Sequence, residues 1–151
     1  CVMITEMAAY YFEQGMTLAQ ALDALYEKYG FYGERTLNLV MPGLDGLEKM
    51  RALMAQLRRE PLQEIAGTKV VRMRDYQDGS VYVMGLGKMD KTSISGSNVL
   101  YFELDDGCSF IVRPSGTEPK IKVYILGVGA TRAECDERVQ RYAQFAETLR
   151  G

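Results

Sequence analysis

The amino-acid sequence predicts an α+β protein, in which a four-stranded antiparallel sheet is flanked by two helices and preceded by a helical hairpin. Two observations carry this prediction. Apolar side chains recur at helical spacing over residues 2–29, 45–60 and 131–149. From Ile65 to about residue 126, short apolar runs are instead separated by Gly, Asp and Ser, which is typical of strands joined by tight turns.

The composition narrows the classes of function. The chain has 18 basic and 20 acidic residues, so its net charge is −2, and general binding of nucleic acid or of membrane surfaces is disfavoured. It contains no histidine, which removes His-based triads and Cys/His zinc sites from this chain. Its three cysteines lie far apart, which argues against a disulfide framework and for a reducing compartment.

Two helices are predicted at the N-terminal end. Residues 2–14 carry a wide apolar stripe, and residues 17–29 carry a second one. Thr17 and Gln20 have the spacing of a capping box at the start of the second helix, and Gly30 is a stop signal. The short turn between the helices predicts a hairpin. Packing in a core or against another domain explains its tyrosines better than a surface for stacking sugar rings does.

The next segment combines a strand and a helix. Apolar residues alternate over 34–41, which predicts a short strand. Asp45 has the position of an N-cap, and the apolar stripe after it predicts a helix that ends before Pro61. We divide the chain into two units, residues 1–40 and residues 41–151.

Four strands are predicted for the sheet of the second unit. They cover about residues 69–75, 99–104, 108–112 and 120–126. A turn at Asp78-Gly79 can extend the first strand into a hairpin with residues 80–84. Residues 85–98 are rich in Gly, Lys, Ser and Thr. Because they lack the spacing of a nucleotide-binding loop, a mobile connector explains them better than a ligand loop does.

A final helix is predicted after the sheet. Gly127 and Gly129 are expected to end the last strand, and Thr131 with Glu134 has the spacing of another capping box. Cys135 lies on the narrow apolar stripe of this helix, so we expect a buried thiol rather than a nucleophile.

The segment between the last two strands, residues 113–119, has the chemistry of an anion-binding loop. Arg113 offers a planar fork of donors that matches two phosphate oxygens, and Ser115 and Thr117 add hydroxyl donors. Gly116 lets the backbone turn so that peptide N–H groups face a ligand, and two prolines stiffen the loop. Composition alone leaves a second interpretation equally open, in which the segment is a rigid hairpin turn with its arginine in water.

The sequence of this segment resembles one particular family. Residues 113–119, RPSGTEP, followed by a basic residue and an alternating strand, are similar to the phosphate-binding loop of the α-D-phosphohexomutase superfamily, which includes phosphoglucomutase and phosphomannomutase. The N-terminal helices also resemble those that close the third of four domains in bacterial phosphoglucomutase-type enzymes. The resemblance implies that residues 1–40 are those helices plus a linker, and that residues 41–151 are a TBP-like fourth domain.

The resemblance also implies a set of binding residues. It assigns the substrate's phosphate to Arg113, Ser115, Gly116 and Thr117. Lys122 is a further candidate, because a basic residue commonly follows the loop in the family, although a solvent-facing strand lysine explains it equally well; Lys120 shares this ambiguity. Glu118 would repel a phosphate, so we expect it to turn away and to pair with a lysine.

The implied function is that of a sugar-phosphate isomerase. The family moves a phosphoryl group between C1 and C6 of a hexose such as glucose or mannose, with an enzyme phosphoserine and a Mg²⁺ ion. Loops typical of that serine, of the metal aspartates and of sugar recognition are not found in this sequence. We therefore expect the phosphate-binding C-terminal portion of a cytoplasmic enzyme, with no catalytic residue, metal or cofactor of its own, inactive without the remaining mutase domains.

Two expectations concern movement and partners. The resemblance implies that the fourth domain moves over the cleft, and residues 41–46 are the expected hinge. The expected partner is a hexose phosphate, with no nucleic acid and no membrane. The alternative function is a non-catalytic interaction module that docks through the helical hairpin. A nucleic-acid binder built on the sheet face is disfavoured by the isoelectric point of 5.3.

Overall fold

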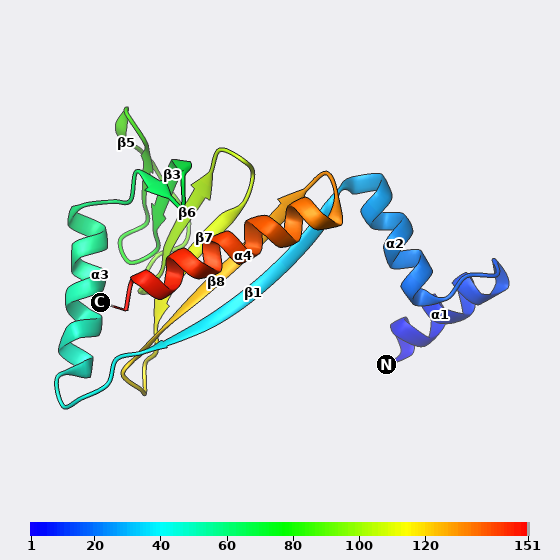
Figure 1. Ribbon diagram of the computed structural model, residues 1–151, viewed down its shortest axis with the longest axis horizontal. Coiled ribbons are helices and arrows are strands. Elements are labelled where there is room, and N and C mark those ends of the chain that lie inside the picture. Colours follow the sequence, from blue (N-terminus) through cyan, green and yellow to red (C-terminus); the bar gives the residue numbers. More distant parts are fainter. Residues whose placement is uncertain (151) are drawn as a thin grey trace.

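The computed structural model describes residues 1–150 (Figure 1). Within these residues the chain forms four helices and a sheet of eight strands. The helices are α1 (Val2–Glu13), α2 (Leu18–Tyr29), α3 (Gly46–Arg59) and α4 (Arg132–Thr148). The strands are β1 (Phe31–Val40), β2 (Glu64–Ile65), β3 (Thr68–Asp75), β4 (Ser80–Val83), β5 (Gly87–Lys91), β6 (Leu100–Leu104), β7 (Ser109–Pro114) and β8 (Lys120–Gly129). The predicted α+β class is confirmed.

The strands form an antiparallel sheet in the order β1-β8-β7-β6-β3-β4-β5, and β2 pairs with β3 beside this path. The predicted number of four strands was too low, since only β3, β6, β7 and β8 were assigned to the sheet. β5 lies in the segment 85–98, where the sequence indicated a mobile connector. Its residues are mostly polar and it pairs only with β4, so no apolar alternation marks it in the sequence.

β1 is the other edge of the sheet and pairs with β8 along all ten of its residues. Its inward-facing Leu37 and Leu39 are buried in the core. The expected division at residue 40 grouped this strand with the N-terminal helices, but its hydrogen bonds place it in the sheet. The chain passes from the helical hairpin to the sheet at Gly30, whose φ of 94° favours glycine. As a division between domains of the family, the boundary at residue 40 stays a prediction.

The segment 41–46, expected to be a hinge, lies within this folded unit. It joins β1 to α3, and both elements contribute side chains to one hydrophobic core. Met41 is only 3% exposed, so its side chain anchors the start of the segment in that core. The segment therefore connects two parts of one hydrophobic core, and its role as a hinge stays a prediction.

α3 and α4 cover one face of the sheet (Figure 1). Their buried side chains share one core with the inward-facing residues of the strands, among which Phe102 and Phe110 are the largest. Burial alternates along β8, as the period of a strand covered on one face predicts. Side chains on the opposite face of β8 are half-buried or exposed.

β8 continues through two glycines that were expected to end it. Gly127 and Gly129 lie where α4 crosses the sheet. A Cβ atom at Gly127 would come within 2.4 Å of the side chain of Val139, and one at Gly129 within 2.6 Å of the backbone nitrogen of Cys135. The close approach of the helix, and not the end of the strand, explains both glycines. Cys135 is buried, as predicted.

The hairpin of α1 and α2 extends away from one end of the sheet (Figure 1). The capping box predicted at Thr17 and Gln20 is present. Most apolar side chains of the hairpin face solvent, and Val2, Met3 and Phe12 are 71%, 77% and 81% exposed. No helix within residues 1–150 has both the length and the apolar character needed to cross a bilayer.

A cation–π contact joins the hairpin to the sheet. The rings of Tyr26 in α2 and Phe31 in β1 stack with their centroids 5.7 Å apart. The guanidinium group of Arg132, at the start of α4, lies 4.4 Å from the centroid of Tyr26 and donates a hydrogen bond to the carbonyl oxygen of Tyr32. This contact orients the hairpin at its base.

A half-buried carboxylate ties α4 to the turn between β6 and β7. Asp106 accepts hydrogen bonds from the Tyr142 hydroxyl and from the Cys108 N–H, and Arg138 of α4 lies 3.6 Å from its carboxylate. Burial by itself would raise the pKa of Asp106, but the hydrogen bonds from Tyr142 and Cys108 and the charge of Arg138 outweigh it, so the pKa lies below its usual value. The carboxylate therefore stabilises the fold in its ionised form.

We predict that Asp106→Asn lowers the free energy of unfolding at neutral pH by about 2 kcal/mol, because the neutral amide weakens charge-assisted hydrogen bonds. The stability that Asp106 contributes is present above the pKa of about 3.9 in the unfolded chain and is lost as the pH falls through the lower folded pKa. Urea unfolding of both proteins should show a difference at neutral pH that shrinks in acid. Asp105→Asn is the control, since Asp105 is exposed in the same turn. Equal effects of the two substitutions would contradict the assignment.

Thiol reactivity should follow burial. Burial raises the pKa of the Cys108 thiol to about 11, and burial also raises the pKa of the Cys135 thiol, whereas Cys1 is exposed. We predict that a disulfide reagent such as dithiobis(nitrobenzoic acid) modifies Cys1 alone in the native chain and all three cysteines in urea. Mass spectrometry of tryptic peptides would identify the sites, and rapid native labelling of Cys108 would contradict the prediction.

Candidate functional site

The loop of residues 115–119 joins β7 to β8, at the end of the sheet where α3 begins (Figure 1). It is attached to that neighbouring segment, because the N–H of Met41 donates a hydrogen bond of 2.8 Å to the carbonyl oxygen of Pro119. Inside the loop, the N–H of Ser115 donates to the carbonyl oxygen of Lys120 at 2.8 Å, which continues the β7–β8 ladder into the turn. The loop is therefore fixed at its base and along one side.

Two cationic side chains lie directly opposite each other beside this loop. Arg113 of β7 pairs in register with Lys122 of β8. The residues that follow and precede Lys122, Val123 and Ile121, are buried, so Arg113 and Lys122 point to the sheet face away from α3 and α4. Arg113 is exposed and Lys122 is half-buried. Among residues 1–150 no side-chain hydrogen bond or ion pair engages either cation, so both are available to an external anion.

The backbone of the loop also presents unused donors. The Thr117 N–H makes only a long hydrogen bond, 3.4 Å, to the Ser115 hydroxyl. Within the described part of the chain, the N–H groups of Gly116 and Glu118 have no protein acceptor. A Cβ atom on Gly116 would meet nothing within 4 Å, which leaves the space around this peptide open. Exposed N–H groups at a turn of this kind suit an anion.

Glu118 is the one acidic residue in the loop, and its charge is neutralised locally. Its carboxylate forms an ion pair with the ammonium group of Lys120. The hydrogen bond and the charge of Lys120 lower the pKa of the Glu118 carboxyl. The expected pairing of Glu118 with a lysine is therefore present, and Lys120, whose role the sequence left open, is engaged by Glu118. The unpaired charge at the loop is that of Arg113 and Lys122.

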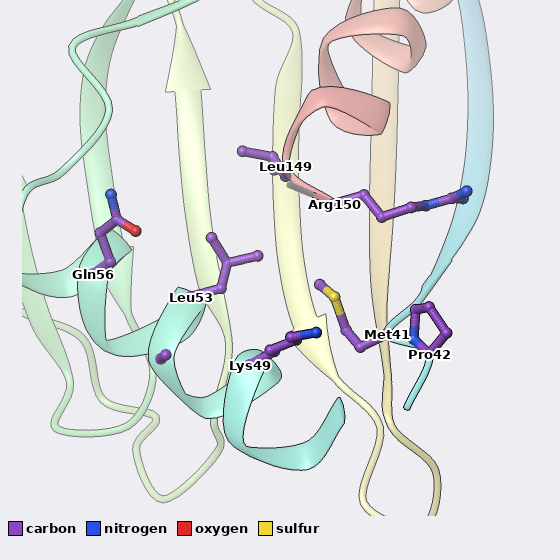
Figure 2. A pocket seen from close by; sticks show the side chains of 8 residues that line it. Met41, Pro42, Lys49, Leu53, Gln56, Leu149 and Arg150 are labelled. Carbon is purple, nitrogen blue, oxygen red and sulfur yellow. The ribbon is translucent and has the colours of Figure 1, made fainter. Parts of the chain in front are cut away.

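A hollow of about 560 Å³ lies on the side of the sheet that the helices cover (Figure 2). Its walls come from α3, from the end of α4 and from the segment after β1. Met41, Leu53 and Leu149 give it an apolar lining. Lys49, at its rim, is paired with Asp45 at 3.0 Å, and the side chain of Arg150 extends away from Lys49 in Figure 2. No pair of free charges converges there, so the hollow does not have the chemistry of an anion site.

The loop carries donors and cations that suit an anion, but the described residues offer little further chemistry. No group of three or more Cys, Asp or Glu side chains within residues 1–150 is arranged to hold a metal ion. The residues present therefore do not fit the Mg²⁺ that the family resemblance implies. The thiols of Cys108 and Cys135 are buried, and burial raises the pKa of both.

The structure brings together all five residues that the sequence singled out. These are Arg113, Ser115, Gly116, Thr117 and Lys122. Their role in binding phosphate stays a prediction. Sequence reasoning missed Met41, which donates a hydrogen bond to the loop from the residue after β1, and Gly46, the first residue of α3, where a Cβ atom would crowd Pro119. The only signal for Gly46 was a second glycine close after Pro42-Gly43, and nothing in the sequence indicated what it would contact.

Comparison with known proteins identifies the family. Residues 37–146 match the family model of the phosphoglucomutase/phosphomannomutase C-terminal domain. A phosphoglucomutase from Staphylococcus saprophyticus is 36% identical over 113 residues, which are 74% of this chain and 20% of the relative. A phosphoglucomutase from Staphylococcus aureus is 38% identical over 112 residues, with the same shares. The chain thus spans about a fifth of the length of these relatives.

A solved structure supports the fold. The open form of the exocytosis-sensitive phosphoprotein pp63/parafusin, a phosphoglucomutase from Paramecium, aligns with 95% of this chain and with 25% of its own, at a TM-score of 0.52 and 12% identity. At this identity the likeness concerns the fold alone. The family follows from the sequence matches: the chain belongs to the phosphoglucomutase/phosphomannomutase family, and its residues 37–146 correspond to the C-terminal domain.

Proposed function

We propose that this chain is the phosphate-binding portion of a phosphoglucomutase or phosphomannomutase, in which the 115–119 loop and its flanking cations clamp the non-reacting phosphate of a hexose phosphate. The observation that carries the proposal is the register pair of Arg113 and Lys122. Both cations lack a partner among the described residues, and the loop that joins their two strands carries the open N–H groups of Gly116 and Glu118. A guanidinium fork, an ammonium group and peptide donors together match the oxygens of one phosphate.

The clamp would contribute position and charge to the reaction. Transfer of a phosphoryl group between C1 and C6 requires the sugar phosphate to be held in line with the reacting centre, and then to be held again after it has turned over. A loop that contacts only the phosphate serves both orientations, because the two ends of the substrate then look alike to it. Arg113 and Lys122 would balance the dianion, and Ser115 and Thr117 would donate to its remaining oxygens.

The other parts of the activity belong, in this proposal, to the remaining mutase domains. They would supply the phosphoserine, the Mg²⁺ site and the contacts that select the sugar. The metal's chemistry would be to neutralise the phosphoryl group in transfer, and no residue of this chain is assigned to hold it. The chain alone would therefore bind phosphate weakly and catalyse nothing, and the whole enzyme would act in the cytoplasm in carbohydrate metabolism.

A second function is favoured by one observation, the exposed apolar surface of the helical hairpin. Val2, Met3 and Phe12 lie on α1 with most of their surface in solvent. Such a surface is typical of a docking site. If docking through this surface were the function of the chain, the chain would be a non-catalytic interaction module with no sugar-phosphate role.

Titration of the isotope-labelled chain with glucose 1-phosphate distinguishes the two functions. We predict amide shifts at Gly116 and Glu118, with a dissociation constant near 1 mM, equivalent to about 4 kcal/mol. Arg113→Ala should weaken binding at least about tenfold. The affinity of Arg113→Lys should lie between those of the unmodified chain and of Arg113→Ala, because lysine keeps the charge and loses the bidentate fork. The measurement is the NMR shift at fixed ionic strength and about pH 7.5, where phosphate is mainly the dianion.

The control variant is Arg59→Ala, which removes the same charge at the far end of α3, where Arg59 pairs only with its neighbour Glu60. It should leave the dissociation constant unchanged. Inorganic phosphate should produce the same shifts as the sugar phosphate if the loop contacts phosphate alone. Absence of loop shifts at saturating ligand would refute the clamp and leave the interaction module as the better proposal.

A further inference from the structure

The loop is docked onto a second segment of the chain. Pro119, its last residue, accepts the hydrogen bond from the Met41 N–H at 2.8 Å. Met41 follows β1 directly, and Val40 before it pairs with Lys120 at the start of β8. Because the Met41 side chain is buried in the core, the donor is held in place from within the fold. The position of Pro119 is therefore set by β1 and not only by the β7–β8 hairpin.

Gly46 lies beside the same contact, and we call the group of Met41, Gly46 and Pro119 the dock. Gly46 is the first residue of α3, and a Cβ atom there would lie 3.1 Å from the Cβ of Pro119 and 2.2 Å from the carbonyl oxygen of Met41. The backbone of Gly46 does not have a positive φ, so its conformation is open to any residue. It is the closeness of Met41 and Pro119 that requires glycine. Any larger residue has to displace the Met41 carbonyl, and it also crowds Pro119.

Two hydrogen bonds of Lys120 connect the dock to the residues of the loop that carry the donors. Fixing Pro119 fixes the following residue, Lys120, whose carbonyl oxygen accepts the N–H of Ser115. Lys120 also donates its own N–H to the carbonyl oxygen of Glu118 at 2.8 Å, and its ammonium group holds the Glu118 carboxylate. The Ser115 hydroxyl and the Glu118 N–H therefore take their positions from a residue that the dock immobilises.

We propose that Met41 and Gly46 are positioning residues of the phosphate site, which hold the 115–119 loop in its binding conformation from the segment between β1 and α3. The inference rests on the proposed binding of phosphate by this loop. A loop that is ordered in advance loses less conformational entropy when it binds, so the dock raises affinity without touching the ligand. By thermodynamic reciprocity, phosphate must then strengthen the dock.

Hydrogen exchange measures that reciprocity in the unmodified chain. We predict that saturating inorganic phosphate slows the exchange of the Met41 amide by about fivefold or more, since its acceptor belongs to the bound loop. The control is the amide of Thr92, which donates to the carbonyl oxygen of Gly79 at 2.7 Å in another loop and should not change. A residue with a merely structural role would show no response to phosphate.

A glycine substitution gives an independent test. Gly46→Ala should weaken phosphate binding about tenfold, because the Met41 carbonyl has to move and Pro119 is crowded. Gly33→Ala is the matched control, since its Cβ atom would crowd the Cys135 sulfur at 3.0 Å, at the other end of β1. It should lower the melting temperature and leave phosphate affinity unchanged. If Gly46→Ala does not fold, the exchange experiment alone decides.

The results of these experiments distinguish the positioning role of Met41 and Gly46 from the proposed binding of phosphate by the loop. Phosphate shifts at Gly116 and Glu118 with unchanged exchange at Met41 would overturn the positioning role and leave the phosphate clamp intact. No phosphate shifts at those two amides would overturn the clamp, and the positioning role with it. Slowed exchange at Met41 together with loop shifts supports both.

Discussion

The antiparallel pairing of β1 with β8 is the contact on which the rest of the structure depends. It runs from Phe31 opposite Gly129 to Val40 opposite Lys120. Because β8 also pairs with β7 on its other side, this strand is held in register by two neighbours. One end of β8 emerges from the candidate site loop, and the glycines near its other end admit α4. A single strand thus places the loop and the covering helix relative to each other.

The same pairing explains why the loop is more than a hairpin tip. A hairpin between β7 and β8 alone would fix the loop from one side. β1 ends opposite the start of β8, so the next residue, Met41, donates a hydrogen bond to Pro119. α3 begins so close that a Cβ atom on Gly46 would lie 3.1 Å from the Cβ of the same proline. The order of the loop therefore depends on a strand and a helix that precede it by some seventy residues in the sequence.

Local signals in the sequence predicted the features that depend on local physics. The capping box at Thr17 and the strands β6 to β8 follow from spacing and side-chain type. The anion-binding role of residues 113–119 was inferred in the same way and stays a prediction. The pairing of β1 with β8, the polar edge strand β5 and the packing of α4 on Gly127 depend on residues distant in the chain. No period or propensity encodes such contacts, which is why the strand number and the end of β8 were predicted wrongly. The contact of Gly46 with Pro119 is of the same kind.

The exposure of Arg113 to water limits the strength with which the loop alone could attract an anion. The interaction energy of two opposite unit charges about 4 Å apart is about 1 kcal/mol in water. It is about 4 kcal/mol at the effective dielectric constant near 20 that suits a partly covered site. Arg113 lies in the first environment, since it is exposed on the open face of the sheet. Under the proposed function, a covering domain would therefore increase the affinity of the same side chains without a new contact, by removing water from them. Under the same proposal, the choice of sugar would come from the covering domain, because the donors of the loop suit a phosphate.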